Sequence, residues 1–307
     1  MSSKTLIAVV GPTAIGKTTL GIALAKHFKT EVISADSRQF FKEMNIGTAV
    51  PSLEELTAVK HHFIQHKSIV EPFSVGDFEK AAIELLETLF QKKNVVVMAG
   101  GSGLYIDAVI NGLDEFPEIA PKLRESLNSK LQKEGIQALQ MELSTKDPLY
   151  HDAVDLENPH RLIRALEVCI STGKPYSSFL NKKKSERNFK SLYVGIQADR
   201  EIIYQRINKR VDMMMEAGLL KEAKSLYPYK SLNAMQTVGY KELFKYIDGH
   251  SSLDFAVSEI KKNTRRFAKR QLTWLRKNKN VLWVDHDEKL GIILNKITEQ
   301  LNTDLHA

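Results

Sequence analysis

The sequence lacks several features that would define other protein classes. Cys169 is the only cysteine among 307 residues. A disulfide framework and a cysteine-built metal site are therefore excluded, and a reducing cytoplasm is favoured. No apolar run approaches the roughly 20 residues of a membrane-spanning helix, and the apolar run at residues 6–10 is too short for a signal peptide. We expect a cytoplasmic, membrane-free protein of one large domain or two.

Acidic residues are absent from one long segment near the C-terminal end. Residues 261–279 contain nine basic residues and no acidic one. The net charge of the chain is +7, and the rest of it is nearly balanced, with 35 of the 44 basic residues against all 37 acidic ones. Such a localised excess is typical of a surface that binds a polyanion, and nucleic acid is the favoured partner.

A glycine-rich loop near the start carries the strongest single motif. An apolar strand is predicted at residues 6–10 and an amphipathic helix at residues 19–28, and the stretch between them fits G-x-x-x-x-G-K-[ST]. Backbone N–H groups, the helix N-terminus and a lysine in this arrangement bind a di- or triphosphate, and the Thr18 hydroxyl can hold Mg²⁺. The predicted loop residues are Gly11, Pro12, Thr13, Ala14, Ile15, Gly16, Lys17, Thr18 and Thr19.

The ends of two further predicted strands differ in their acidity. Residues 31–36 read as a short strand that ends at Asp36, which should face the phosphate loop because ligands lie at the carboxyl ends of parallel strands. A structural role as a helix N-cap or a turn residue is the alternative for this aspartate. The buried strand predicted at residues 94–98 is followed by Ala99 and glycines, where nucleotide hydrolases carry a Walker-B acid. ATP or GTP hydrolysis is therefore disfavoured.

The α/β alternation stops in the middle of the chain. Residues 123–143 and 159–171 have helical periodicity, and strand character returns at residues 191–196. We predict an α/β fold with a P-loop NTPase-like core, whose parallel sheet is flanked by helices, at residues 1–112 and 191–307. A mostly helical subdomain is inserted at 113–190. A zinc site at His61, His62 and His66 is a weak alternative to a loop packed near the site.

Further patterns lie in the C-terminal half. Residues 201–217 predict a strong helix with Gly218 at its end, and residues 236–241 form a glycine turn with an exposed-looking aromatic side chain. In the basic segment one stripe is apolar or uncharged, and the basic side chains occupy the other faces of the predicted helix. The stripe consists of Val257, Ile260, Thr264, Phe267, Gln271 and Trp274.

Together these motifs resemble the bacterial tRNA dimethylallyltransferases, also called tRNA isopentenyltransferases. The stretches that carry the resemblance are GPTAIGKT (11–18), ADSRQF (35–40), IGTAVP (46–51), HHF (61–63), GGSGLY (100–105), NPHRLIRALEV (158–168), TGKPYS (172–177), RINKRVDMMMEAGLLKE (206–222), TVGYKEL (237–243) and TRRFAKRQLTWLR (264–276). They follow the family order along nearly the whole chain. The phosphate loop alone is shared with many enzymes, whereas the whole set is specific.

The resemblance implies transfer of a dimethylallyl group from dimethylallyl diphosphate to N6 of the adenosine 3′ of the tRNA anticodon. It implies that the phosphate loop holds the donor diphosphate with Mg²⁺ at Thr18, that Lys17 and Arg210 stabilise the leaving group, and that Asp36 is the general base. Contacts with the anticodon stem-loop are implied at Asp36, Ser37, Arg38, Gln39, Ser102, Arg124, His160, Arg161, Leu162, Ile163, Arg164, Gln236, Thr237, Val238, Gly239, Tyr240, Lys241, Lys269, Arg270 and Arg276. Residues 182–190 would clamp the anticodon stem, and residues 261–279 would follow the phosphate backbone.

Three other functions remain as alternatives. A small-molecule kinase would need a lid arginine pair, which Arg206 and Arg210 could supply, and a strand-end acid near residue 98, which is missing. An adenylate isopentenyltransferase would use the same donor with a free nucleotide, and it would not need the basic helix. A non-catalytic RNA-binding protein would not need an intact Gly16-Lys17-Thr18 sequence together with Asp36. We expect the protein to be a monomer.

Overall fold

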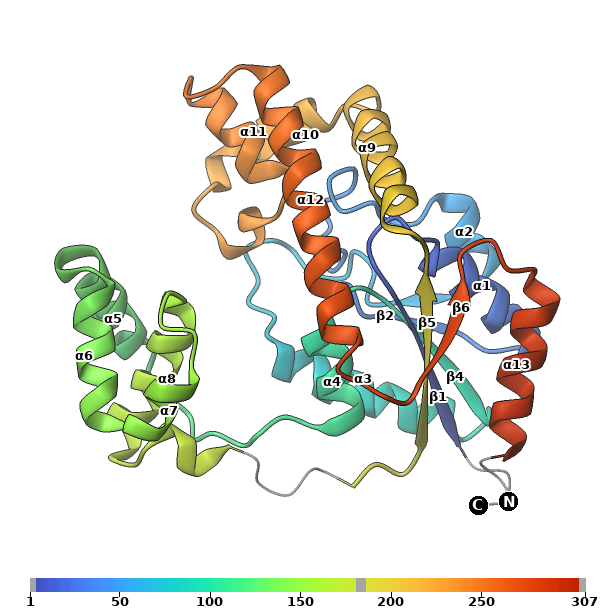
Figure 1. The fold of residues 1–307 in the computed structure, drawn as a ribbon, viewed down its shortest axis with the longest axis horizontal. Helices are drawn as coiled ribbons and strands as arrows, with labels where there is room; N and C mark the ends of the chain where they lie inside the picture. The colour runs from blue at the N-terminus through green and yellow to red at the C-terminus, as the bar shows by residue number, and fades with distance from the viewer. Residues whose placement is uncertain (1–3, 181–185, 304–307) are drawn as a thin grey trace. The chain divides into compact units, whose positions relative to one another are not determined.

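The computed structural model describes residues 4–180 and 186–303, and the fold is built on a parallel sheet (Figure 1). Its six strands, in the order β3-β2-β4-β1-β5-β6, are all parallel. This order places the phosphate loop, which follows β1, between the strand ends of β4 and β5. The strands are β1 (Thr5–Val10), β2 (Val32–Ser34), β3 (His61–His62), β4 (Val95–Ala99), β5 (Lys190–Gln197) and β6 (Val281–Asp285).

Helices cover both faces of the sheet, which is why its central strands are apolar throughout. Every residue of β1 is buried, and its side chains alternate between two clusters. Ile7 and Val9 pack with α1 (Lys17–His27), α9 (Arg200–Glu216) and α13 (Leu290–Thr303). Leu6, Ala8 and Val10 pack with α3 (Val75–Leu89) and α4 (Gly103–Asn111). The predicted fold class, an α/β core with a flanked parallel sheet, is confirmed.

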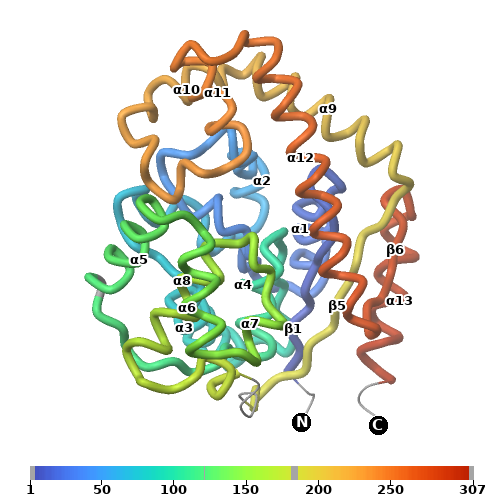
Figure 2. The backbone as a smooth tube through the Cα atoms, turned by 60° about the vertical axis from the view of Figure 1, so that its left-hand side comes forward, coloured from blue at the N-terminus to red at the C-terminus, as the bar shows by residue number. Residues whose placement is uncertain are grey.

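A third apolar cluster lies beyond the sheet. It joins α10 (Leu219–Leu226), α11 (Tyr240–Ile247) and the first half of α12 (Leu253–Leu275) to the chain around Met44. Figure 2 shows α12 and α9 as neighbouring helices, and the long α12 extends from this cluster to α4 (Figure 1). One helix thus contacts both the sheet and the third cluster. The short helix α2 (Leu53–Ala58) completes this unit.

Residues 111–186 form a second compact unit of helices with its own core, centred on Leu139, Leu143 and Leu162. This unit begins after Ile110 and ends before Arg187, whereas the sequence predicted an inserted subdomain at 113–190. The first boundary lies near its predicted position because α4, the last helix of the first unit before the insertion, ends at Asn111. The helices of this unit are α5 (Pro121–Glu134), α6 (Ile136–Lys146), α7 (Pro148–Ala153) and α8 (Pro159–Thr172). The predicted basic residues 182–184 lie outside the described residues.

Three local predictions need correction. The helical pattern at 123–143 is interrupted at Gly135, whose φ of 80° ends α5 and begins α6, because a helical periodicity does not report a single turn residue. His61 and His62 lie in the edge strand β3 and not in a loop. The strand expected at 31–36 is regular only over β2, and the remainder forms the turn that carries Asp36.

Candidate functional site

The phosphate loop has the backbone that its glycines predict. Gly11 and Gly16 have φ values of 149° and 112°, and Ala14 between them also has a positive φ of 65°. A Cβ atom on Gly11 would lie 2.8 Å from the carbonyl oxygen of Ile196 in β5, so only glycine fits there. Helix α1 begins at Lys17, and its N-terminus therefore points into the loop, as anion binding requires.

The ammonium group of Lys17 is held over this loop. Its Nζ donates to the carbonyl oxygens of Gly11 at 3.1 Å and Pro12 at 2.8 Å. Burial lowers the pKa of Lys17 to about 8, against an opposing attraction from Asp36 and with a further lowering by Arg210. Burial thus destabilises the charged form of Lys17 in the free protein. An anionic ligand would stabilise that charged form.

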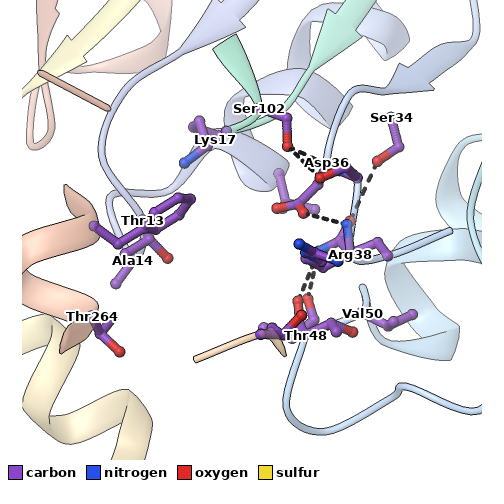
Figure 3. A pocket seen from close by; sticks show the side chains of 18 of the residues that line it. Thr13, Ala14, Lys17, Ser34, Asp36, Arg38, Thr48, Val50, Ser102 and Thr264 are labelled. Atoms are coloured by element: carbon purple, nitrogen blue, oxygen red, sulfur yellow. Dashed lines mark hydrogen bonds between the residues drawn. The ribbon is translucent and has the colours of Figure 1, made fainter. Parts of the chain in front are cut away.

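Asp36 lies in the turn after β2, next to the phosphate loop. Figure 3 shows its carboxyl group and Lys17 on the same side of the cavity. Asp36 Oδ1 accepts a hydrogen bond from the backbone N–H of Arg38 at 3.1 Å. Burial raises the pKa of Asp36, although this hydrogen bond and the charges of Lys17, Arg38 and Arg210 oppose the increase. A carboxylate with a raised pKa is a stronger proton acceptor than one in water.

The glycine turn after β4 fixes the position of the Asp36 turn. The Ser102 hydroxyl accepts a hydrogen bond from the backbone N–H of Ser37 at 3.0 Å and lies 3.1 Å from the Ser37 hydroxyl. A Cβ atom on Gly100 would lie 2.3 Å from the Ala35 carbonyl oxygen, so the two turns could not approach each other with any other residue there. Ser102 therefore supports the turn that carries the candidate base, in addition to lining the cavity.

Two arginines of α9 approach the phosphate loop one helical turn apart. Arg206 Nε donates to the Ala14 carbonyl oxygen at 2.7 Å, and Arg210 Nη1 lies 3.5 Å from the Thr13 hydroxyl. Arg210 was predicted as a site residue. Arg206 was considered only as a possible lid arginine of a kinase, because the i, i+4 spacing could not show which helix face meets the loop.

Gln271 of α12 joins the phosphate loop to the glycine turn, and sequence reasoning missed it. Its Oε1 accepts from the Thr13 backbone N–H at 2.8 Å, and its Nε2 donates to the Gly101 carbonyl oxygen at 2.9 Å. The amide occupies the space that a side chain on Gly101 would need, since a Cβ there would be 2.3 Å from Nε2. An uncharged polar residue within an otherwise mainly apolar stripe was the available signal.

These elements enclose a cavity of about 970 Å³. Its wall includes Thr264, Phe267, Gln271 and Trp274, so part of the predicted stripe faces the cavity. Of the loop residues, all but Gly11 and Pro12 line it. The other predicted residues that line it are Asp36, Ser37, Arg38, Gln39, Ser102, Arg210, Gln236, Thr237, Val238, Gly239, Lys241 and Arg270.

Tyr240 is a correction to the sequence analysis. The turn was expected to expose this aromatic side chain for tRNA contact, but Tyr240 is fully buried in the third apolar cluster. Its hydroxyl donates to Glu222 Oε1 at 2.7 Å, and its ring fills the space beside Gly47. The turn remains at the cavity through its neighbours Gly239 and Lys241, whereas Tyr240 is packed on the opposite side of the backbone.

The predicted residues of the second unit divide by burial. Leu162 and Ile163 are core residues of that unit, so their side chains cannot reach RNA. His160 and Arg161 are exposed at the start of α8. Arg124 makes a bidentate ion pair with the buried Glu167, at 2.6 and 2.7 Å.

The basic segment is less free than its sequence suggests. Lys261 Nζ lies 2.6 Å from a carboxylate oxygen of Asp212 in α9, Lys262 pairs with Glu259, and Arg265 donates to Asn208 Oδ1 at 2.8 Å. The acids lie outside the segment in sequence, and the packing of α12 on α9 supplies the first of them. Lys269, Arg270 and Arg276 are exposed.

Metal ligands are few in the residues that the structure describes. No group of three or more histidine, cysteine, aspartate or glutamate side chains could hold a metal ion there, so the described histidines do not form the alternative zinc site. Thr18 at the start of α1 lines the cavity. This arrangement fits Mg²⁺ in its usual phosphate-bound form, in which the substrate and water supply most of the oxygen ligands. None of the described helices is long and apolar enough to cross a membrane.

The fold and the site define a P-loop enzyme of an unusual kind. The P-loop and a half-buried carboxyl group line one cavity, and β4 ends in Ala99 and glycines instead of an acid. Comparison with known proteins identifies the family. A family model described as IPP transferase matches residues 39–278. The chain belongs to the IPP transferase family, which confirms the resemblance found in the sequence.

Individual relatives match most or all of this chain. The tRNA dimethylallyltransferase of Christiangramia forsetii is 60% identical, with 98% of this chain and 100% of that protein covered. That of Flavobacterium johnsoniae is 58% identical with the same coverage. The crystal structure of the full-length tRNA isopentenylpyrophosphate transferase of Bacillus halodurans is 39% identical, with a TM-score of 0.72 over 98% of this chain and 97% of that one. A eukaryotic dimethylallyltransferase acting on tRNA is 27% identical, with a TM-score of 0.79 over 92% of this chain and 74% of that one.

Proposed function

We propose that this protein transfers the dimethylallyl group of dimethylallyl diphosphate to N6 of the adenosine 3′-adjacent to the anticodon in tRNA. The relatives at 55–60% identity, all named tRNA dimethylallyltransferase, support the activity. The observation that carries the chemistry is the shared cavity, which has a phosphate-binding loop with Lys17 beside a half-buried carboxyl group and no strand-end acid on β4. Such a site needs to hold a diphosphate and accept a proton, but it does not need to activate water.

The donor occupies the phosphate-loop side of the cavity in this proposal. Backbone N–H groups of residues 14–18 and the ammonium group of Lys17 bind the diphosphate, and Arg210 adds a second cation from α9. These charges stabilise the diphosphate most when the carbon–oxygen bond breaks, because negative charge then accumulates on the leaving group. Mg²⁺ bound at the Thr18 hydroxyl and the diphosphate would supply further neutralisation of that charge.

The acceptor amine approaches from the Asp36 side. A new bond forms between N6 and carbon one of the dimethylallyl group while the bond from that carbon to diphosphate oxygen breaks. The amine proton passes to the Asp36 carboxylate, and the diphosphate leaves with the bonding electron pair. Removing such a base costs about 10²- to 10⁴-fold in rate. The adenosine must leave its stack to enter the cavity, which costs a few kcal/mol that protein contacts offset.

The remaining predicted contacts form the RNA side of the proposal. Ser37, Arg38 and Gln39 would meet the flipped nucleotide, and Lys241 and Arg270 lie at the cavity edge where phosphates would pass. His160, Arg161 and Arg164 of the second unit would contact the anticodon stem. The protein would act as a cytoplasmic monomer, with tRNA as its macromolecular substrate.

Incubation with labelled dimethylallyl diphosphate tests this function directly. We expect label in tRNA that has adenosine next to the anticodon, and an Asp36→Asn variant that binds tRNA normally while turnover falls about 10²- to 10⁴-fold. The exposed Asp152→Asn variant is the matched control. Label in free AMP would favour an adenylate isopentenyltransferase, and phosphate transfer from ATP would favour a kinase. Near-normal turnover of Asp36→Asn would remove this residue as the base.

A further inference from the structure

The carboxylate of Glu222, in α10, receives four hydrogen bonds that the proposed chemistry does not use. Glu222 Oε2 accepts from the backbone N–H groups of Asn45 at 3.1 Å and Ile46 at 2.8 Å. Oε1 accepts from the N–H of Gly47 at 2.9 Å and from the Tyr240 hydroxyl at 2.7 Å. Donors on both oxygens fix the carboxylate, and the carboxylate fixes the three successive peptide groups.

The same loop is closed from the other side by Tyr240. A Cβ atom on Gly47 would lie 2.5 Å from the Tyr240 ring, so the ring packs directly on the glycine backbone. Tyr240 is fully buried and cannot move away without opening the third apolar cluster. Residues 45–47 are thus held between a carboxylate and an aromatic ring, and the peptide groups that follow them are held in a fixed direction.

The next two carbonyl groups of this loop are directed at Gln39. Gln39 Nε2 donates to the carbonyl oxygens of Thr48 at 3.1 Å and Ala49 at 3.0 Å. A primary amide has two N–H groups, and both are therefore occupied. The Ser34 hydroxyl is 3.4 Å from Gln39 Oε1, at the long end of the hydrogen-bond range. Gln39 can offer the cavity its carbonyl oxygen, which only accepts hydrogen bonds.

Gln39 and Asp36 are two ends of one turn, joined by a hydrogen bond from the Gln39 N–H to the Asp36 carbonyl oxygen at 3.0 Å, and both residues line the cavity. An exocyclic amine has two N–H groups and would find an acceptor in each side chain. A base with a carbonyl oxygen in the same place would face two acceptors and lose both hydrogen bonds.

We propose that Glu222 is a positioning residue for recognition of the acceptor base. Through the loop at residues 45–49, Glu222 and the Tyr240 hydroxyl orient the amide of Gln39 so that it accepts a hydrogen bond from the amine of adenine. This inference rests on the proposed function, because it takes adenosine as the acceptor. It assigns discrimination between amine and carbonyl bases to a carboxylate that touches no substrate.

The test compares two anticodon stem-loop RNAs that differ only in adenosine or inosine at the acceptor position. Binding is measured by competition in the presence of inorganic diphosphate, so that no reaction occurs. We expect the native protein to prefer adenosine, and the preference to fall about tenfold in Glu222→Gln because one amide cannot replace the carboxylate toward three N–H groups. Tyr240→Phe, which removes one of the four hydrogen bonds, should reduce the preference by a smaller factor.

Glu216→Gln is the matched control, since Glu216 is exposed at the end of α9 and the same charge is removed. Its adenosine preference and its affinity for dimethylallyl diphosphate should equal those of the native protein. If Glu222→Gln and Tyr240→Phe bind both RNAs more weakly by the same factor, the two residues are only structural and the inference is overturned. If Glu222→Gln fails to fold, an unchanged preference in Tyr240→Phe overturns it equally. Failure of the proposed function is distinguishable, because the native protein would then not prenylate the adenosine RNA.

Discussion

Lys17 offers a quantitative test of how the donor is bound, because its charge is costly before the donor arrives. Burial lowers its pKa to about 8 in the free protein. A bound diphosphate places negative charge against the ammonium group and raises that pKa again. Binding above pH 8 therefore takes up a proton. Affinity for dimethylallyl diphosphate should fall with a slope that approaches about tenfold per pH unit, and the fall should reach about 50-fold between pH 8 and pH 10. Below pH 8 Lys17 is already protonated, and this dependence disappears.

Lys17→Arg is the matched variant, since a guanidinium group remains charged through the whole range. The ionisation of the diphosphate itself affects both proteins equally, so the ratio of their affinities isolates the titration of Lys17. Isothermal titration calorimetry between pH 7 and pH 10, in buffers of different ionisation enthalpy, measures both the affinity and the proton uptake. A ratio that stays constant from pH 7 to pH 10, with no proton uptake by the native protein, would refute the reasoning.

Three further predictions follow from contacts at and around the cavity. Gln271→Glu replaces the donor to the Gly101 carbonyl oxygen with a carboxylate oxygen, which that carbonyl repels. We expect the KM for dimethylallyl diphosphate to rise about 10- to 100-fold. The exposed control Gln205→Glu should leave steady-state kinetics unchanged. Arg124→Gln leaves the buried Glu167 without its bidentate partner and should lower the free energy of unfolding by about 1–3 kcal/mol in urea titrations; unchanged stability would show that Glu167 is satisfied without it. Lys269→Gln should reduce the slope of log affinity for tRNA against log salt by about 0.7–0.9, whereas Lys261→Gln should leave the slope unchanged because Lys261 already pairs with Asp212; equal slopes in both variants would contradict this assignment.

The pH dependence of turnover should report the ionisation of a second residue, Asp36. Because burial raises the pKa of Asp36, loss of activity on acidification should begin at a higher pH than for an exposed aspartate. Asp36 must be deprotonated to accept a proton, so activity decreases as the pH falls through this raised pKa. This acidic decrease should be seen in the pH profile of kcat/KM for tRNA, measured with saturating dimethylallyl diphosphate.

Sequence alone determined the features that depend only on residues close together in the chain. The phosphate loop is specified by the spacing of Gly11 and Gly16 before Lys17, since glycine permits the positive φ values that turn the backbone N–H groups toward an anion. The apolar run of β1 and the position of Asp36 after β2 follow from the same kind of short-range pattern. The order of motifs along the chain was specific enough to indicate the family.

Tertiary structure alone decided which residues from distant segments meet. Tyr240 follows a glycine turn in sequence and was expected to be exposed, but the packing of α10 and α11 buries it against Gly47 and Glu222. The basic run contains no acid, yet the packing of α12 on α9 gives Lys261 an acidic partner in Asp212. Gln271 bridges two loops that are far apart in the chain. Periodicity reports which residues share a helix face, but the partner of that face depends on contacts between segments that no local pattern contains.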